Sequence, residues 1–341
     1  MSTLGSNVLT LTDWAKRLDP KGKVDKTVEL LSQTNEILTD MLWKEGNLPT
    51  GHRTSIRTGL PTVYWRLMNQ GVAPSKSTTA QVDEQCGMLE AWSEVDKDLA
   101  ELNGNVGTFR LNEAMAFLES MNQEMADTMF YGTASNPEEF IGFDARYSDL
   151  SANNAQNILD AGGTGSDNMS IWLVGWGGNE CHGIFPQGSK AGIMHEDLGL
   201  VTVETTAGIA GNRMRAYQDH WQWKSGLVLQ DWRYVVRIAN IDVSDLVGLT
   251  GTQAITASTS IIKLMARAID RLPKIAGIKP VFYANRTARS HLRIAAMDKS
   301  ASAVAIEPAM NQFGQPQRQM FYDEVPVRLV DRLTEIESQI T

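Results

Sequence analysis

The sequence predicts an α+β fold that combines one long helix, a sheet with long strands and a compact unit of alternating helices and strands. Apolar residues recur at three- and four-residue spacing through residues 110–131, as in a long helix. Residues 214–238 are rich in β-branched and aromatic side chains, as in long strands. After Asp245 helix and strand patterns alternate, which is typical of a unit with its own core.

The composition is that of a globular protein and limits the classes of function. The 341 residues are 42% hydrophobic and 21% charged, enough for two domains with cores. No window approaches eighteen consecutive apolar residues, so we expect neither secretion nor membrane insertion. The formal net charge of −9 disfavours tight non-specific binding of nucleic acid by the bulk surface.

The first 45 residues predict a terminal arm with two helices. Thr12 can cap a short helix that Pro20 ends. A second helix is predicted over residues 24–43, with apolar side chains roughly on one face and Gly46 as its stop. Such an amphipathic terminal segment needs another surface to lie on.

Residues 46–82 contain four basic residues and no Asp or Glu, although the chain is acidic overall. Strand-forming residues occur around Ile56 and again at residues 63–65, between turn-forming Gly and Pro residues. We therefore predict a long basic hairpin that cannot bury its own apolar residues and packs on another molecule. The candidate contact residues are Arg53, Arg57, Tyr64, Trp65, Arg66 and Lys76.

A long helix and several long strands are predicted to follow the hairpin. Thr108 can cap the helix over residues 110–131, and its stripe of Leu and Met side chains indicates a buried structural element. Strands are predicted over residues 170–175 and 199–204. Two further runs, 214–223 and 227–238, predict an antiparallel hairpin with a turn at residues 224–226.

The C-terminal part of the chain predicts a compact α+β unit. A helix over residues 256–272 ends at Pro273, and a short buried strand follows over residues 279–284. A second helix passes through Leu292, and residues 325–329 predict a last strand. The change of pattern places a domain boundary near residue 245.

The sequence offers little to support catalysis. Cys181 and His182 are neighbours, but adjacent residues on a strand point to opposite faces and share a proton poorly. Residues 183–190 resemble a phosphate-binding loop, yet Ser189 and Lys190 stand in the reverse of the required order. The histidines and the two cysteines have no metal-binding spacing. We expect no enzyme activity, no catalytic residue, no cofactor and no metal.

Several phrases along the chain carry a family resemblance, which covers nearly its whole length. They are residues 63–76, 117–131, 171–176 with 184–190, and 226–242. These phrases resemble the major capsid proteins of tailed bacteriophages, which have the Hong Kong 97-type fold. Within that family they look closest to the shell proteins of epsilon-fifteen-like and Bordetella-phage podoviruses.

The resemblance implies a role for each region. Residues 1–45 would be the N-terminal arm, residues 46–93 the extended E-loop, residues 94–245 a peripheral domain with the spine helix at 110–131, and residues 246–341 the axial domain. The protein would assemble with itself into hexamers and pentamers of an icosahedral virion shell around double-stranded DNA, in the host cytoplasm. The resemblance also allows a decoration or cement protein, a scaffolding protein and a portal as partners, with weak non-specific DNA contact and no membrane contact.

One departure from the family pattern predicts a permuted connectivity. In the prototype the axial block precedes the long peripheral strands, whereas here the strand block at 170–243 precedes the block at 254–333. We also expect a non-covalent shell, because no residue match supports a cross-link between a lysine and an asparagine. Two alternatives stay open: an encapsulin-like cargo compartment of the same fold, and a cytoplasmic α+β enzyme with a site near Cys181 and His182.

Overall fold

A single sheet organises the computed structural model, and the α+β class is confirmed. The model describes residues 32–102, 106–204, 213–247, 252–297, 304–310 and 316–341. The short helix expected after Thr12 lies outside these residues. The strands of the described chain are β1 (Trp43–Glu45), β2 (Gly51–Gly59), β3 (Thr78–Asp96), β4 (Ile158–Asp160), β5 (Asn168–Trp176), β6 (Cys181–Phe185), β7 (Ile193–Glu204), β8 (Arg213–Leu229), β9 (Val235–Asp242), β10 (Lys279–Ala284), β11 (Val304–Met310), β12 (Pro316–Tyr322) and β13 (Val325–Leu329).

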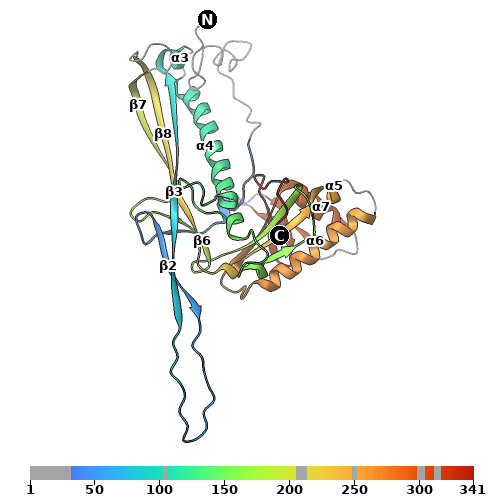
Figure 1. Cartoon of the computed structure of the whole chain (residues 1–341). Coiled ribbons are helices and arrows are strands. Elements are labelled where there is room, and N and C mark those ends of the chain that lie inside the picture. The colour runs from blue at the N-terminus through green and yellow to red at the C-terminus, as the bar shows by residue number, and fades with distance from the viewer. Residues whose placement is uncertain (1–31, 103–105, 205–212, 248–251, 298–303, 311–315) are drawn as a thin grey trace.

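Three longer helices, α4, α6 and α7, lie beside the sheet (Figure 1). Across the described ranges, no helix combines the length and apolar character needed to span a membrane. The helical segments are α2 (Ile37–Asp40), α3 (Lys97–Glu101), α4 (Val106–Tyr131), η1 (Asp144–Arg146), η2 (Ala155–Asn157), η3 (Trp232–Tyr234), α5 (Val243–Val247), α6 (Thr252–Arg271) and α7 (Arg286–Met297).

The strand β3 links the projecting hairpin to the body of the molecule. Its 19 residues extend for about 60 Å. Its N-terminal part, up to Gln85, pairs with β2, and the rest pairs with β8 from Cys86 to Asp96. The predicted hairpin is therefore confirmed, and Figure 1 shows it leaving the body in the direction opposite to the upper end of α4.

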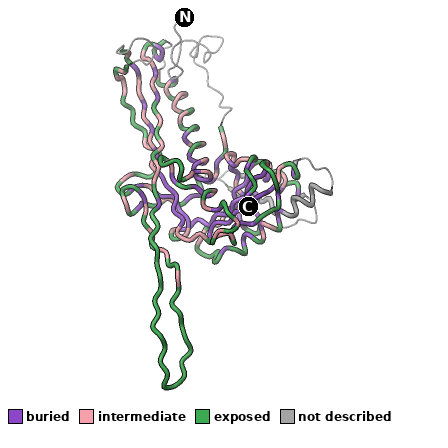
Figure 2. The backbone as a smooth tube through the Cα atoms, viewed as in Figure 1, coloured by how far each residue is buried: buried purple, intermediate pink, exposed green. Residues whose placement is uncertain are grey.

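The central strands are buried on both faces. Along β5, Ile171 and Leu173 face the cluster that contains α6 and α7, whereas Trp172 and Val174 face the cluster that contains α4. Because side chains alternate along a strand, this sandwich explains why β5 is apolar at nearly every position. Figure 2 shows the buried backbone concentrated in this part of the molecule.

The sheet and the core continue across residue 245, where the sequence predicts a domain boundary. Strands β5 and β10 are antiparallel neighbours, and β9 pairs with β5. One apolar cluster combines Ile238 of β9 with Met265 of α6 and Phe282 of β10. Strand pairing and apolar packing therefore both cross the change of pattern near 245, and the domain boundary there stays a prediction.

The long helix α4 is confirmed, and it begins at Val106, before the predicted cap at Thr108. Phe109 is buried against Val95 and Ala100, and this packing holds the first turns. The Met stripe is core only in the C-terminal half of α4, where Met121, Met125 and Met129 are buried. The N-terminal half differs from the prediction, because its apolar side chains Leu111, Met115 and Leu118 are exposed.

The predicted hairpin of residues 214–238 is wrong. Strand β8 runs without a break through residues 224–226, and it pairs with β3 and β7. The chain turns only at η3, after which β9 pairs with β4 and β5. Residues 224–226 resemble a turn in the sequence because they are Lys, Ser and Gly. In the structure, a side-chain carbon on Gly226 would lie 2.6 Å from the Gln85 carbonyl oxygen of β3. The glycine therefore allows β8 to approach β3 closely.

The predicted helix over residues 24–43 is also wrong in its described part. Only the four residues of α2 are helical, and Trp43 belongs to β1, which pairs in parallel with β6. Met41 is buried and would be 3.0 Å or less from a side chain at Gly183 of β6. Packing on the sheet therefore overrides the helical periodicity of this segment.

The last strand, β13, pairs with β10 and β12. Pairing of this strand with β3 or β8, the strands that run along α4, would have refuted a permuted connectivity, and its partners are β10 and β12 instead. The permutation itself stays a prediction.

Candidate functional site

The end of the hairpin is the most exposed apolar part of the described chain. We call residues 60–77 the tip; they follow the last β2–β3 pair, Gly59 with Thr78. Within the tip, Ser75 Oγ donates a hydrogen bond to the Thr62 carbonyl oxygen at 2.7 Å. Its exposed large apolar residues are Leu60, Val63, Tyr64, Trp65, Leu67, Met68 and Val72.

The tip is irregular, although its residues 63–65 read as a strand in the sequence. No ladder includes these residues in the described structure, and the second strand of the hairpin starts only at Thr78. A turn at Leu67–Gln70, where Asn69 adopts a φ of 65°, reverses the chain. Aromatic and β-branched residues stabilise a strand mainly by packing against neighbouring side chains, and those of the tip face solvent. Val63 and its neighbours therefore do not form a strand despite their β-propensity.

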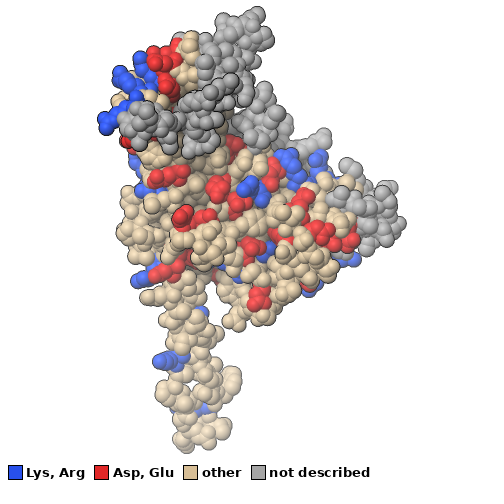
Figure 3. Space-filling model, turned by 45° about the horizontal axis from the view of Figure 1, so that its top comes forward, with Lys and Arg blue, Asp and Glu red and all other residues tan. Residues whose placement is uncertain are grey.

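The basic residues of the hairpin differ in whether they already form an ion pair within the described chain. Arg53 donates two hydrogen bonds of 2.6 Å to the Asp83 carboxylate across the hairpin. This contact raises the pKa of Arg53 and lowers that of Asp83. Arg57, Arg66 and Lys76 have no ion-pair partner within the described residues. Figure 3 shows the projecting end with blue and tan surface and no red in that view.

The base of the hairpin is anchored by polar contacts that the sequence analysis missed. Glu84 of β3 forms a buried ion pair with Arg146, with both Nη atoms 2.6–2.7 Å from its carboxylate oxygens. Asn47 accepts a hydrogen bond from the Arg53 amide and donates one to its carbonyl oxygen. These partners are separated by up to 62 residues, so no local pattern reveals the buried pair.

A close backbone approach also fixes the base. A side-chain carbon on Gly51 would lie 2.0 Å from the Glu84 carbonyl oxygen. Only glycine fits at this point, which holds β2 against β3 where the hairpin leaves the body.

The two neighbours considered for catalysis are both buried. Burial raises the pKa of the Cys181 thiol well above its ordinary value. Burial, helped by the charge of Lys44, lowers the pKa of His182 to about 4. The His182 ring meets that of His52 edge to face at 6.0 Å, and neither of its nitrogens has a hydrogen-bond partner within the described structure. At neutral pH the thiol is protonated and the imidazole is neutral, which disfavours nucleophilic chemistry.

Neither a phosphate loop nor a metal centre is formed among the described residues. The chain after Lys190 enters β7 at Ile193 and so presents no helix N-terminus to a phosphate. No group of three or more His, Cys, Asp or Glu side chains gathers where a metal ion could be held, as far as the chain is described.

Comparison with known proteins identifies a protein family and several similar solved structures. The family model of the major capsid protein GP7 matches residues 19–341. A chain of bacteriophage Epsilon15, solved by cryo-electron microscopy, is 30% identical, with a TM-score of 0.76. The match covers 100% of this chain and 99% of that chain.

More distant capsid structures also match. A chain from the capsid of a native GTA particle is 9% identical with a TM-score of 0.44, over 66% of this chain and 95% of that one. A chain from the bacteriophage JBD30 capsid is 9% identical with a TM-score of 0.42, over 90% and 93% of the two chains. No curated protein sequence matches the chain.

Proposed function

The chain belongs to the major capsid protein GP7 family of tailed phages, and we propose that its exposed hairpin tip docks on a neighbouring subunit to build the shell. The protein has the Hong Kong 97-type fold and self-assembles into the capsid of the virion. The observation that carries the proposal is the tip itself, in which Trp65 and six further large apolar side chains are exposed.

Exposed apolar area of this kind indicates an interface. Burying one large apolar side chain stabilises a complex by about 1.5–3 kcal/mol before the costs of association. A closed shell repeats each contact in every subunit, so a modest gain per subunit suffices. Arg57, Arg66 and Lys76 would then set the register against acidic surface of the neighbour, because charge complementarity contributes more to specificity than to affinity.

The proposal assigns a finer role to each contact residue. Tyr64 and Trp65 supply apolar contact, and the three cations without an ion-pair partner among the described residues, Arg57, Arg66 and Lys76, supply register. Arg53 is already paired with Asp83 inside its own hairpin, so we assign it to holding the two strands together.

Charge reversal in the hairpin tests this assignment. Arg57→Glu with Arg66→Glu should abolish most particles in electron micrographs while the subunit stays soluble. The matched control, Arg57→Lys with Arg66→Lys, keeps the charge and should assemble. Normal particles from the reversed variant would count against docking by the hairpin.

The remaining features of the shell belong to the same proposal. The subunits form hexamers and pentamers around double-stranded DNA, in the host cytoplasm and without covalent links, with residues 1–45 as arm and 246–341 as axial domain. A decoration protein, a scaffolding protein and a portal would complete the particle. Covalent ladders on denaturing gels of intact particles would contradict the non-covalent shell.

The contents of purified particles separate this function from a cargo compartment of the same fold. Nuclease-protected DNA is expected inside particles from infected cells. A protein cargo without DNA would favour the compartment, and a small oligomer without particles would favour an enzyme.

A further inference from the structure

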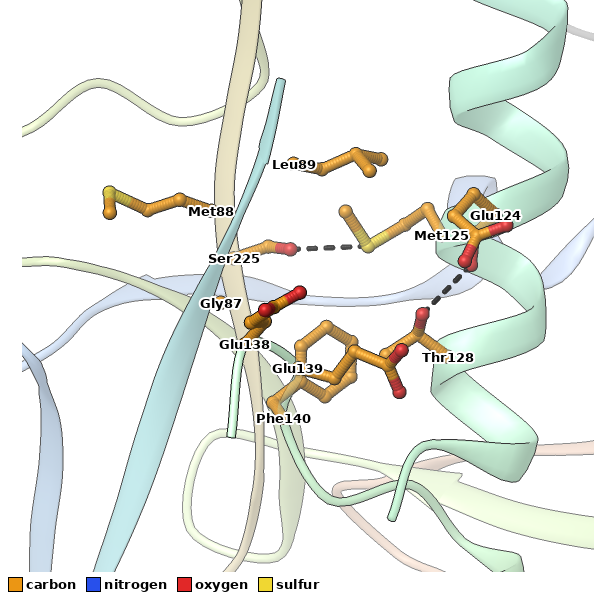
Figure 4. A pocket seen from close by; sticks show the side chains of 10 residues that line it. All are labelled: Gly87, Met88, Leu89, Glu124, Met125, Thr128, Glu138, Glu139, Phe140 and Ser225. Atoms are coloured by element: carbon orange, nitrogen blue, oxygen red, sulfur yellow. Dashed lines mark hydrogen bonds between the residues drawn. The ribbon is translucent and has the colours of Figure 1, made fainter. Parts of the chain in front are cut away.

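A hollow with an acidic rim lies between α4, β3 and the loop after α4 (Figure 4). Its volume is about 170 Å³. Its floor is apolar: Met125 and Phe140 are buried there and Leu89 of β3 is half-buried, whereas the Met88 side chain points to the other side of the strand (Figure 4). The lining residues are Gly87, Met88, Leu89, Glu124, Met125, Thr128, Glu138, Glu139, Phe140 and Ser225.

The acids around the hollow lack cationic partners. Glu124, Glu138 and Glu139 line it, and none of the three is ion-paired within the described residues. Glu139 accepts a hydrogen bond of 3.3 Å from Asn136, a neutral donor. The hollow therefore combines an apolar floor with carboxylates that have no cationic partner among the described residues, whereas the tip combines exposed apolar side chains with cations that have no acidic partner there.

We propose that this hollow receives the Trp65–Arg66 part of the tip of a second copy of the chain. The indole of Trp65 would cover Leu89 and Phe140, and the guanidinium of Arg66 would face the carboxylates of the rim, so that opposite charges meet. This inference rests on the proposed docking of the hairpin and names its receptor.

The occupant has to be another copy, because the chain's own tip is too far away. The hollow touches β3 at Gly87, nine residues beyond the start of the strand at Thr78. A strand rises by about 3.3 Å per residue, so Thr78 lies about 30 Å from the hollow, and the tip extends further in the same direction (Figure 1).

Cysteine cross-linking tests the contact directly. Trp65→Cys and Glu138→Cys are introduced together in a Cys86→Ser background, and assembled particles are oxidised and run on a non-reducing denaturing gel. We expect ladders of covalent multimers that a reductant collapses. The matched control replaces the exposed Glu196 of β7 in place of Glu138 and should stay monomeric on the gel.

A charge swap gives a second measurement that does not depend on oxidation. The variant Arg66→Glu alone should form few particles, and the double variant with Glu138→Arg should form particles again. Circular dichroism of each soluble subunit checks that the fold is kept.

The outcomes separate this inference from the proposed function. Ladders specific to position 138, with rescue by the swap, support the receptor. If the hairpin variants lose particles but position 138 gives neither ladders nor rescue, the hollow is not the receptor and hairpin docking still stands. The same conclusion follows if the cysteine pair gives only an internally linked monomer. Normal assembly of the hairpin variants overturns both.

Discussion

Replacing Glu337 by alanine is expected to lower the free energy of unfolding by about 3 kcal/mol, because it removes a partner of a buried arginine. The Arg237 side chain is 1% exposed, and its Nη2 donates to Glu337 Oε2 at 2.9 Å. Glu337 also accepts hydrogen bonds from Tyr131 and Ser170. The residue thus ties the C-terminal tail to α4, β5 and β9.

The size of the loss in unfolding free energy depends on the partners that Arg237 keeps in the variant. Removing one partner of a buried ion pair costs about 3–5 kcal/mol when the other charge is left uncompensated. Here Asp144 remains 2.6 Å from Arg237 Nη1, and the Tyr147 carbonyl oxygen accepts from the same nitrogen at 2.9 Å. The guanidinium keeps a counter-charge, which places the loss at the low end of that range. Glu337→Gln keeps an acceptor and should cost about 1.5–2 kcal/mol.

Urea unfolding of the unassembled subunit measures the loss. Trp172 is a fluorescent reporter at the site, since its ring lies 4.8 Å from the Arg237 guanidinium carbon. With a slope of about 3 kcal/mol per molar urea, the alanine variant should unfold about 1 M earlier. The control Glu138→Ala removes an exposed carboxylate and should shift the midpoint little. An alanine variant at 337 that unfolds together with this control would refute the reasoning.

Three further predictions concern the hairpin and its base. Burial lowers the pKa of folded His182 to about 4 from an ordinary value of 6.5, so the unfolded chain binds the proton first as pH falls. The stability that depends on the neutral imidazole is present above pH 6.5 and is lost between pH 6.5 and 4, up to about 3 kcal/mol. In a plot of the urea midpoint against pH, His182→Gln should therefore have a smaller slope between pH 6.5 and 4 than the native chain, and an unchanged slope would contradict the prediction. Gly51→Ala forces β2 away from Glu84 and should speed amide hydrogen exchange in β2, whereas protection equal to that of the native chain would contradict the close contact. Trp65→Ser should leave the subunit's urea midpoint unchanged but lower particle yield in sedimentation, and a shifted midpoint would show that the indole packs within its own subunit.

Local patterns predicted the elements whose residues decide their own structure. The period of apolar residues revealed α4, because its C-terminal half packs along one face. The acid-free composition revealed the hairpin, and the candidate residues Trp65 and Arg66 lie on its exposed tip. The motif phrases carried the family, since they occur along nearly the whole chain.

Predictions failed where a distant strand decided the outcome. Residues 224–226 read as a turn, but pairing with β3 keeps them extended. Trp43 read as the end of a helix, but pairing with β6 makes it a strand. In both cases the partner lies more than a hundred residues away, and the hydrogen bonds and packing that it supplies exceed the small differences in local propensity.

The sequence by itself determined the α+β fold class, the hairpin and the charge of the hairpin, because composition and periodicity are properties of the chain alone. Only the tertiary structure decided which charges are free. It paired Arg53 with Asp83 and buried Glu84 against Arg146, whereas Arg66 of the tip has no ion-pair partner in the part of the chain that the structure describes. It also brought Glu124 of α4 and Glu138 of the following loop beside Leu89 of β3. Charge compensation depends on distances of a few ångströms between residues far apart in the chain, and folding alone sets those distances.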